Sequence, residues 1–223
     1  MKKAIFVLFA ACLLMVSIGC SKDEEAAKTE TEDSTLKSPV DSLAAISHPV
    51  RNENNPFVTL VTDKGNMTLE LYRDVAPIHA DSFLARVNDG FYDNLIFHRV
   101  LPQFMIQGGD PLGNGTGGAG YYLQAEFSEL PHQKGTLSMA RSRDPNSASS
   151  QFFICLARNA MTKNLDGAYT VFGQLIKGYD VLDAIGKVKC MPNPLNKPEV
   201  SRPIEPVYLR SAYKSNAEGT EVM

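Results

Sequence analysis

The sequence predicts a mainly β domain of the barrel or sandwich kind, preceded by an extension over residues 1–55. Many short period-2 runs separated by Gly, Pro, Asn and Ser clusters, only two helical patterns, and no βαβ alternation or internal repeat support this class. The 223 residues leave room for one ordinary domain plus the extension. A hydrophobic content of 43% is typical of globular proteins, and a net charge of −3 argues against general nucleic-acid binding.

The first 19 residues are typical of a bacterial lipoprotein signal peptide. A basic Lys2-Lys3 start precedes an apolar run over residues 4–18, which is too short to span a bilayer. The run ends in Gly19-Cys20 and resembles a lipobox, although Ser17 stands where that pattern prefers Leu. We expect cleavage before Cys20 and lipidation of this cysteine. The alternative is a plain secretory signal followed by a chance cysteine.

The segment after the leader reads as a flexible tether. Residues 20–55 are rich in charged residues, Ser and Thr, and they cannot bury enough apolar surface to offset their ordering entropy. We therefore expect a signal peptide at 1–19, a lipidated tether at 20–55, a domain at 56–215 and a tail at 216–223. This organisation predicts a protein anchored by lipid in the bacterial cell envelope. Because residue 21 is Ser and not Asp, we expect the outer membrane, facing the periplasm.

The start of the domain predicts a β-hairpin followed by a helix. Phe57–Thr62 alternates loosely, a turn cluster occupies residues 63–66, and residues 67–71 alternate again. Pro77 has the φ angle of a first helical turn, the apolar residues that follow recur at helical spacing, and Gly90 suits a C-terminal cap. We expect this helix over residues 77–88.

The rest of the domain predicts short strands and one more helix. Strand-like runs lie at 135–140, 151–156 and 169–172, and a closing strand is expected through 204–209. The second helix is expected over 179–185, ending at Gly186.

Cysteine usage leaves two possibilities for the domain. Cys155 lies in an apolar run, which favours a buried free thiol, while a disulfide with Cys190 stays open outside the cytoplasm.

Two patterns that resemble ligand sites do not pass a test of their context. Residues 115–120 satisfy G-x-G-x-x-G, but no strand precedes them and no helix follows, as dinucleotide binding requires. The four histidines lack metal-ligand spacing, and we expect neither a metal nor a cofactor. His98, between Phe97 and Arg99, is expected to be a hydrogen-bonded structural residue rather than a base.

Three segments carry the chemistry of the domain. They are FHRVLPQFMIQGGD at 97–110, LSMAR at 137–141 with SSQFFI at 149–154, and NLDGAYTVFG at 164–173. They combine a fixed cation, amide side chains and large apolar groups, without a paired acid and base or an activated nucleophile. Such a site suits binding a neutral peptide rather than hydrolysing it.

In this order, and with G-T-G-G at 115–118, these motifs resemble those of cyclophilin-type peptidyl-prolyl cis–trans isomerases over residues 57–213. The resemblance implies a closed eight-stranded antiparallel β-barrel capped by two α-helices. It also implies rotation about X-Pro bonds, whose barrier is about 18–20 kcal/mol. The family's catalytic residues match Arg99, Phe104 and Gln107. Its substrate-binding residues match Met105, Gly115, Ala140, Arg141, Gln151, Phe153, Leu165 and Tyr169.

The chain departs from the best-known pattern of this family at three positions. Many cyclophilins have Trp where Asn164 stands, His where Tyr169 stands, and Asn where Arg141 stands. Asn164 weakens the expected affinity for cyclosporin, because the family's tryptophan contacts that drug. The resemblance implies proline-containing peptides and unfolded envelope proteins as partners. The alternative is a catalytically weak peptide-binding or chaperone module that uses the same groove.

Overall fold

The computed structural model describes Asn52 and residues 54–222. The expected signal peptide, Cys20 and nearly all of the expected tether lie outside the described residues. Within the described part, no helix is long and apolar enough to cross a membrane.

The described residues begin just before the expected domain start. Asn55 is buried, and its side chain donates a hydrogen bond to Glu70. At the other end, a turn follows the last strand and brings Glu221 into a β-bridge with Ser215.

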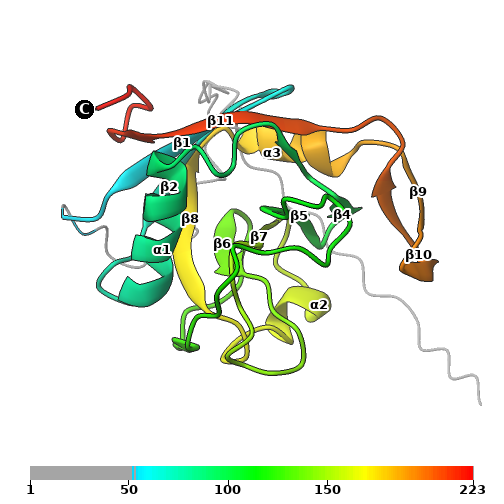
Figure 1. Ribbon diagram of the computed structural model, residues 1–223, viewed down its shortest axis with the longest axis horizontal. Coiled ribbons are helices and arrows are strands. Elements are labelled where there is room, and N and C mark those ends of the chain that lie inside the picture. The colour runs from blue at the N-terminus through cyan, green and yellow to red at the C-terminus, as the bar shows by residue number, and fades with distance from the viewer. Residues whose placement is uncertain (1–51, 53, 223) are drawn as a thin grey trace, which may run out of the picture. The chain divides into compact units, whose positions relative to one another are not determined.

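Among the described residues, nine strands form one antiparallel sheet that curls around the core (Figure 1). Their spatial order is β3-β11-β1-β2-β8-β6-β7-β5-β4. In chain order the strands are β1 (Phe57–Thr62), β2 (Gly65–Leu71), β3 (Leu95–Ile96), β4 (Arg99–Leu101), β5 (Met105–Gly108), β6 (Thr136–Met139), β7 (Phe152–Cys155), β8 (Val171–Lys177) and β11 (Tyr208–Ser215). The mainly β prediction is confirmed.

The two ends of this sheet are consecutive in the chain. β3 and β4 are separated only by Phe97 and His98. Within the described residues, the strand pairing joins β3 to β11 and β4 to β5 but not β3 to β4. Closure of an eight-stranded barrel therefore stays a prediction, and the count of nine includes the two-residue β3.

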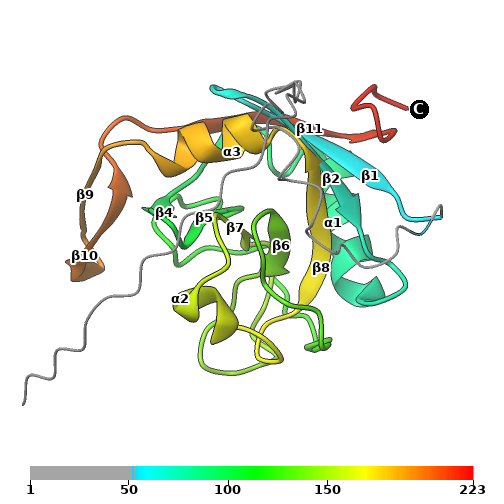
Figure 2. The same ribbon diagram turned by 180° about the vertical axis from the view of Figure 1, so that it is seen from behind.

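Three helices are described, two of them at the expected places. α1 (Pro77–Asn88) has Pro in its first turn, and α3 (Tyr179–Gly186) follows the left-handed Gly178. α1 packs against β8 and β11, and α3 packs against β2, β4 and β5 (Figures 1 and 2). α2 (Ala160–Lys163) was not expected. The residue that could have predicted this one-turn helix is Asn159, whose side chain caps its N-terminus.

Strand alternation divides the sheet into two faces with different tasks. On the inner face five aromatic side chains pack together, and each is almost fully buried: Phe83, Tyr92, Phe97, Phe152 and Phe172. The rings of Phe83 and Tyr92 lie 5.3 and 5.6 Å from that of Phe152, nearly perpendicular to it. The next residue, Phe153, points to the opposite face and joins a small cluster with Met105 and Cys155.

Both described cysteines are free thiols. Burial raises the pKa of Cys155 to about 12. The expected buried thiol is confirmed, and the disulfide with Cys190 is not formed.

A separate two-stranded hairpin is an element that the sequence did not predict. It consists of β9 (Cys190–Asn193) and β10 (Asn196–Pro203), and it packs against β4 (Figure 1). Proline residues interrupt both strands, and proline argues against strand structure because it cannot donate to a ladder. The expected closing strand also starts later than predicted, at Tyr208, and Ile204 is exposed.

Candidate active site

A pocket of about 380 Å³ lies on the outer face of β4, β5 and β7. Every site residue expected from the sequence lines it except Gln151. The lining residues that were expected are Arg99, Phe104, Met105, Gln107, Gly115, Ala140, Arg141, Phe153, Leu165 and Tyr169. The fold therefore brings ten residues from separate segments to one place.

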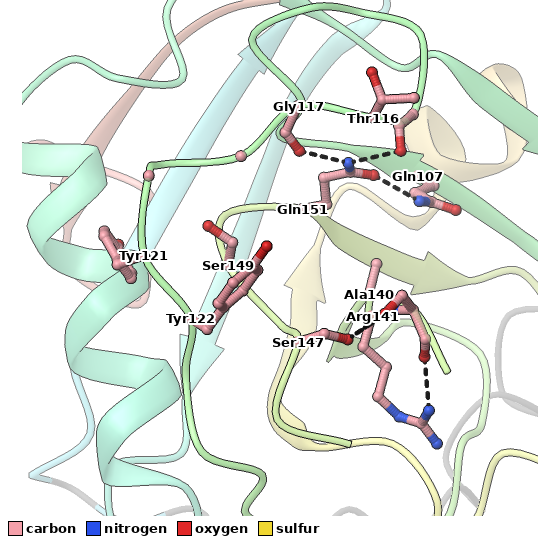
Figure 3. Close-up of a pocket in the computed structure, with 14 residues that line it drawn as sticks. Gln107, Thr116, Gly117, Tyr121, Tyr122, Ala140, Arg141, Ser147, Ser149 and Gln151 are labelled. Carbon is pink, nitrogen blue, oxygen red and sulfur yellow. Dashed lines mark hydrogen bonds between the residues drawn. The ribbon is translucent and has the colours of Figure 1, made fainter. Parts of the chain in front are cut away.

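A second groove of about 530 Å³ continues the first and holds Gln151. The two cavities share Gln107, Gly115, Ala140 and Arg141. In Figure 3 Gln151 lies between Gln107 and the glycine-rich loop of residues 115–120. The loop is irregular throughout, so the rejection of a dinucleotide site at 115–120 is consistent with the structure. An extended ligand can lie along both cavities.

The floor of the pocket is apolar and tightly packed. Met105 and Phe153 are 2% and 5% exposed, and Phe104 and Leu165 pack against them. The ring of Tyr169 meets that of Phe153 edge-on at 5.8 Å. Such a floor favours a small apolar ring, because each Å² removed from water is worth about 25 cal/mol.

A series of hydrogen bonds runs along the polar side of the pocket, and the donor and the acceptor of each bond are determined. Gln151 Nε2 donates to the carbonyl oxygens of Gly115 and Gly117, at 3.1 and 2.8 Å. Gln107 Nε2 donates to Gln151 Oε1 at 2.9 Å (Figure 3), and Arg99 Nη1 donates to Gln107 Oε1 at 3.2 Å. Carbonyl oxygens only accept and guanidinium groups only donate, so both amide orientations are determined from the two ends.

Arg99 has a further partner that the sequence did not indicate. Its Nε donates to Glu199 Oε1 at 2.8 Å, and its Nη2 donates to Glu199 Oε2 at 2.6 Å. The hydrogen bonds from Arg99 lower the pKa of Glu199. Glu199 lies on β10, 100 positions from Arg99, and Asn193 and Leu195 of the same hairpin line the pocket. No local motif could have found these residues.

Arg141 contributes its side chain to the site. Its guanidinium lies 4.5 Å from the ring centroid of Tyr169 and donates to the carbonyl oxygen of Ala168 at 2.7 Å. A cation above an aromatic face is attracted by the ring quadrupole. Arg141 therefore fixes the turn that carries Tyr169. Asn164 caps α2, is exposed, and does not line the pocket.

The expected hydrogen bond of His98 is not found. The ring is 5% exposed, and neither of its nitrogens has a hydrogen-bond partner among the described residues. Burial lowers the pKa of His98. The nearby carboxylate of Asp110 accepts instead from the backbone N–H groups of Leu112, Asn114 and Gly115. The prediction that the His98 ring is hydrogen-bonded is therefore wrong for the described residues.

Over residues 54–222, no group of three or more His, Cys, Asp or Glu side chains could hold a metal ion.

Asp166 stabilises the turn that carries Leu165. It accepts from the backbone N–H of His132 at 2.8 Å and from Arg158 Nη2 at 2.6 Å. Although burial opposes ionisation, the hydrogen bonds from Arg158 and His132 lower the pKa of Asp166 to about 2. The pKa of an Asp in an unfolded chain is about 3.9, so this carboxylate stabilises the folded state above that pH.

We expect Asp166→Asn to lower the free energy of unfolding at pH 7 by about 1–2 kcal/mol, a figure reduced because Asp166 is partly exposed. The wild type loses this contribution as the pH falls from about 4 to about 2, and the variant has none to lose. Urea unfolding at several pH values measures both effects. Asp144→Asn, at an exposed turn position, is the control. Equal pH dependence in the wild type and Asp166→Asn would contradict the assignment.

Comparison with known proteins agrees with this geometry. Residues 57–213 match the family described as "Cyclophilin type peptidyl-prolyl cis-trans isomerase/CLD". A peptidyl-prolyl cis-trans isomerase of Synechococcus elongatus is 48% identical over 115 residues, which cover 52% of this chain and 77% of the relative. The isomerase ppi1 of Schizosaccharomyces pombe is 41% identical over 160 residues, covering 70% of this chain and 96% of the relative.

A bifunctional relative and two crystal structures extend the comparison. A putative bifunctional phosphatase/peptidyl-prolyl cis-trans isomerase of Streptococcus pyogenes is 41% identical over 170 residues, which cover 63% of this chain but only 36% of that protein. A crystal structure of a cyclophilin type isomerase from Cryptosporidium parvum has a TM-score of 0.65 and 32% identity, covering 73% of this chain and 98% of that one. A second, in the presence of the dipeptide Ala-Pro, has a TM-score of 0.64 and 34% identity, covering 72% of this chain and 99% of that one.

Proposed function

The chain belongs to the cyclophilin-type peptidyl-prolyl cis–trans isomerases, and we propose that it rotates X-Pro bonds of proteins in a bacterial cell envelope, where a lipid on Cys20 anchors it. One observation supports the assignment of the site above all others. Arg99 and an apolar floor, drawn from separate segments, meet in one pocket that opens onto a longer groove.

In the proposed mechanism Arg99 stabilises the twisted amide. Amide resonance makes uncatalysed rotation slow, and in the twisted state the proline nitrogen regains a lone pair. A donor aimed at that nitrogen binds the twisted state better than the planar one. Glu199 and Gln107 engage three of the five N–H groups of Arg99, which leaves two for the substrate.

The apolar floor supplies the second part of the proposal. Phe104, Met105, Phe153 and Leu165 receive the proline ring, and Tyr169 closes one side of the pocket. Holding the ring while the preceding carbonyl group turns is a matter of positioning, because no covalent bond is broken. The groove beside Gln151 takes the chain that precedes the proline, and the same shape would suit any extended proline-containing segment.

The envelope location has its own test. We expect Cys20→Ser to move the protein from the membrane fraction to the soluble fraction, because each buried CH₂ of a lipid contributes about 0.8 kcal/mol to anchoring. Fractionation of the producing cells followed by immunoblotting measures this. Cys12→Ser, within the expected leader, is the matched control and should remain in the membrane fraction. Unchanged membrane association of Cys20→Ser would remove the lipid anchor from the proposal.

A further inference from the structure

The β9–β10 hairpin lies outside the main sheet and still reaches the active site. Its strands pair only with each other among the described strands, and it packs against β4, the strand that begins with Arg99 (Figures 1 and 2). Asn193 and Leu195 line the pocket, and Glu199, which does not line it, accepts two hydrogen bonds from Arg99.

The contact between Arg99 and Glu199 is bidentate. One N–H from Nε and one from Nη2 meet the two carboxylate oxygens at 2.8 and 2.6 Å, the parallel arrangement that makes such pairs strong and directional. The side chains are 30% and 17% exposed, so the pair is only partly screened by water. Two parallel bonds fix the plane of the guanidinium, which a single contact cannot do.

Glu199 is also the last member of the hydrogen-bond chain along the pocket. Gln151 donates to the backbone carbonyl of Gly117, Gln107 donates to Gln151, and Arg99 donates to Gln107. Arg99 also donates to Glu199, which is the only anionic acceptor in this series of hydrogen bonds between described residues. If Glu199 were removed, Arg99 would keep one described bond, to Gln107 at 3.2 Å. Its long side chain would then regain much of its rotational freedom.

We infer that Glu199 is a positioning residue, whose carboxylate holds the guanidinium of Arg99 so that the two remaining N–H groups face the proline nitrogen. This inference rests on the proposed role of Arg99. Glu199 does not itself line the pocket, so it does not occupy the space that the substrate needs. Glu199 therefore supports the active site from outside the space that the substrate would fill.

The test compares Glu199→Gln with Glu205→Gln in cis–trans exchange of a short X-Pro peptide, measured by NMR without a protease. Glutamine keeps the shape of Glu199 and removes its charge, and Glu205 is an exposed glutamate a few residues further along the chain. We expect kcat of Glu199→Gln to fall about tenfold while KM changes less than about twofold, because orientation of the donor matters most in the transition state. Glu205→Gln should behave as the wild type.

A spectroscopic measurement separates positioning from a general structural effect. In the wild type the Nε–H of Arg99 should exchange slowly with water, since it is bound to Glu199, and Glu199→Gln should accelerate this exchange. Wild-type kcat in Glu199→Gln, a faster rate, or a lost rate with an unchanged Arg99 Nε–H signal would each overturn the inference. An inactive wild type would instead refute the proposed function, and the inference with it.

Discussion

Replacing Arg99 with alanine is expected to lower kcat/KM for X-Pro isomerisation by about two to three orders of magnitude, which corresponds to about 3–4 kcal/mol of transition-state stabilisation. Arg99 lines the pocket beside the apolar floor, and its free N–H groups are the donors that we assign to the proline nitrogen. The loss should appear mainly in kcat, because the floor that binds the proline ring is unchanged. Exchange of a short X-Pro peptide, measured by NMR without a protease, gives both constants.

Arg99→Lys distinguishes the geometry of the donor from its charge. A lysine keeps the charge but cannot form the two parallel bonds to Glu199 and a third to Gln107 at the same time. We expect its rate to lie within about tenfold of that of Arg99→Ala. Arg202→Ala, an exposed change on β10, is the control. Wild-type rates in Arg99→Ala would refute the assignment, and binding of the peptide without exchange in the wild type would identify a peptide-binding module.

Neighbouring phenylalanines on β7 should give opposite results when each is changed to alanine. Phe152 is completely buried among the aromatic side chains of the core, so Phe152→Ala should cost about 3–5 kcal/mol of unfolding free energy. Phe153 faces the pocket, so Phe153→Ala should cost less stability and lower kcat/KM about tenfold or more, mainly through KM.

Urea unfolding and peptide exchange on the same preparations measure this contrast. Each variant is the control for the other, because both remove the same side chain from adjacent positions of one strand. Full activity in Phe153→Ala, or a similar loss of stability in both variants, would contradict the assignment of Phe152 to the core and of Phe153 to the substrate pocket.

Local patterns predicted the elements whose determinants are local. The first hairpin and α1 were located from alternation at 57–71 and from Pro77 and Gly90, and the structure has them within two residues of the expected bounds. The β9–β10 hairpin was missed because its prolines hide the strand pattern. For such strands, long-range packing outweighs intrinsic propensity.

The candidate site was predictable to a similar extent. Ten of its lining residues came from the resemblance of contiguous motifs. Glu199 carries no such signal, because its partner lies 100 positions away and a single glutamate among exposed residues looks like ordinary surface. The hydrogen bond expected for His98 was wrong for a related reason. The sequence does not reveal that the carboxylate of Asp110 accepts from the backbone N–H groups of residues 112, 114 and 115.

The place of β11 in the sheet has a consequence for how the protein is made. This strand, close to the C-terminal end, lies between β1 and β3, and Phe57 pairs with Ser215. A ribosome adds about 5–20 residues per second, so β1 waits about 8–30 s for its partner. Pairings of such long sequence separation also slow folding itself. β1 and β3 can therefore gain β11 as their neighbour in the sheet only after residue 215 has been synthesised.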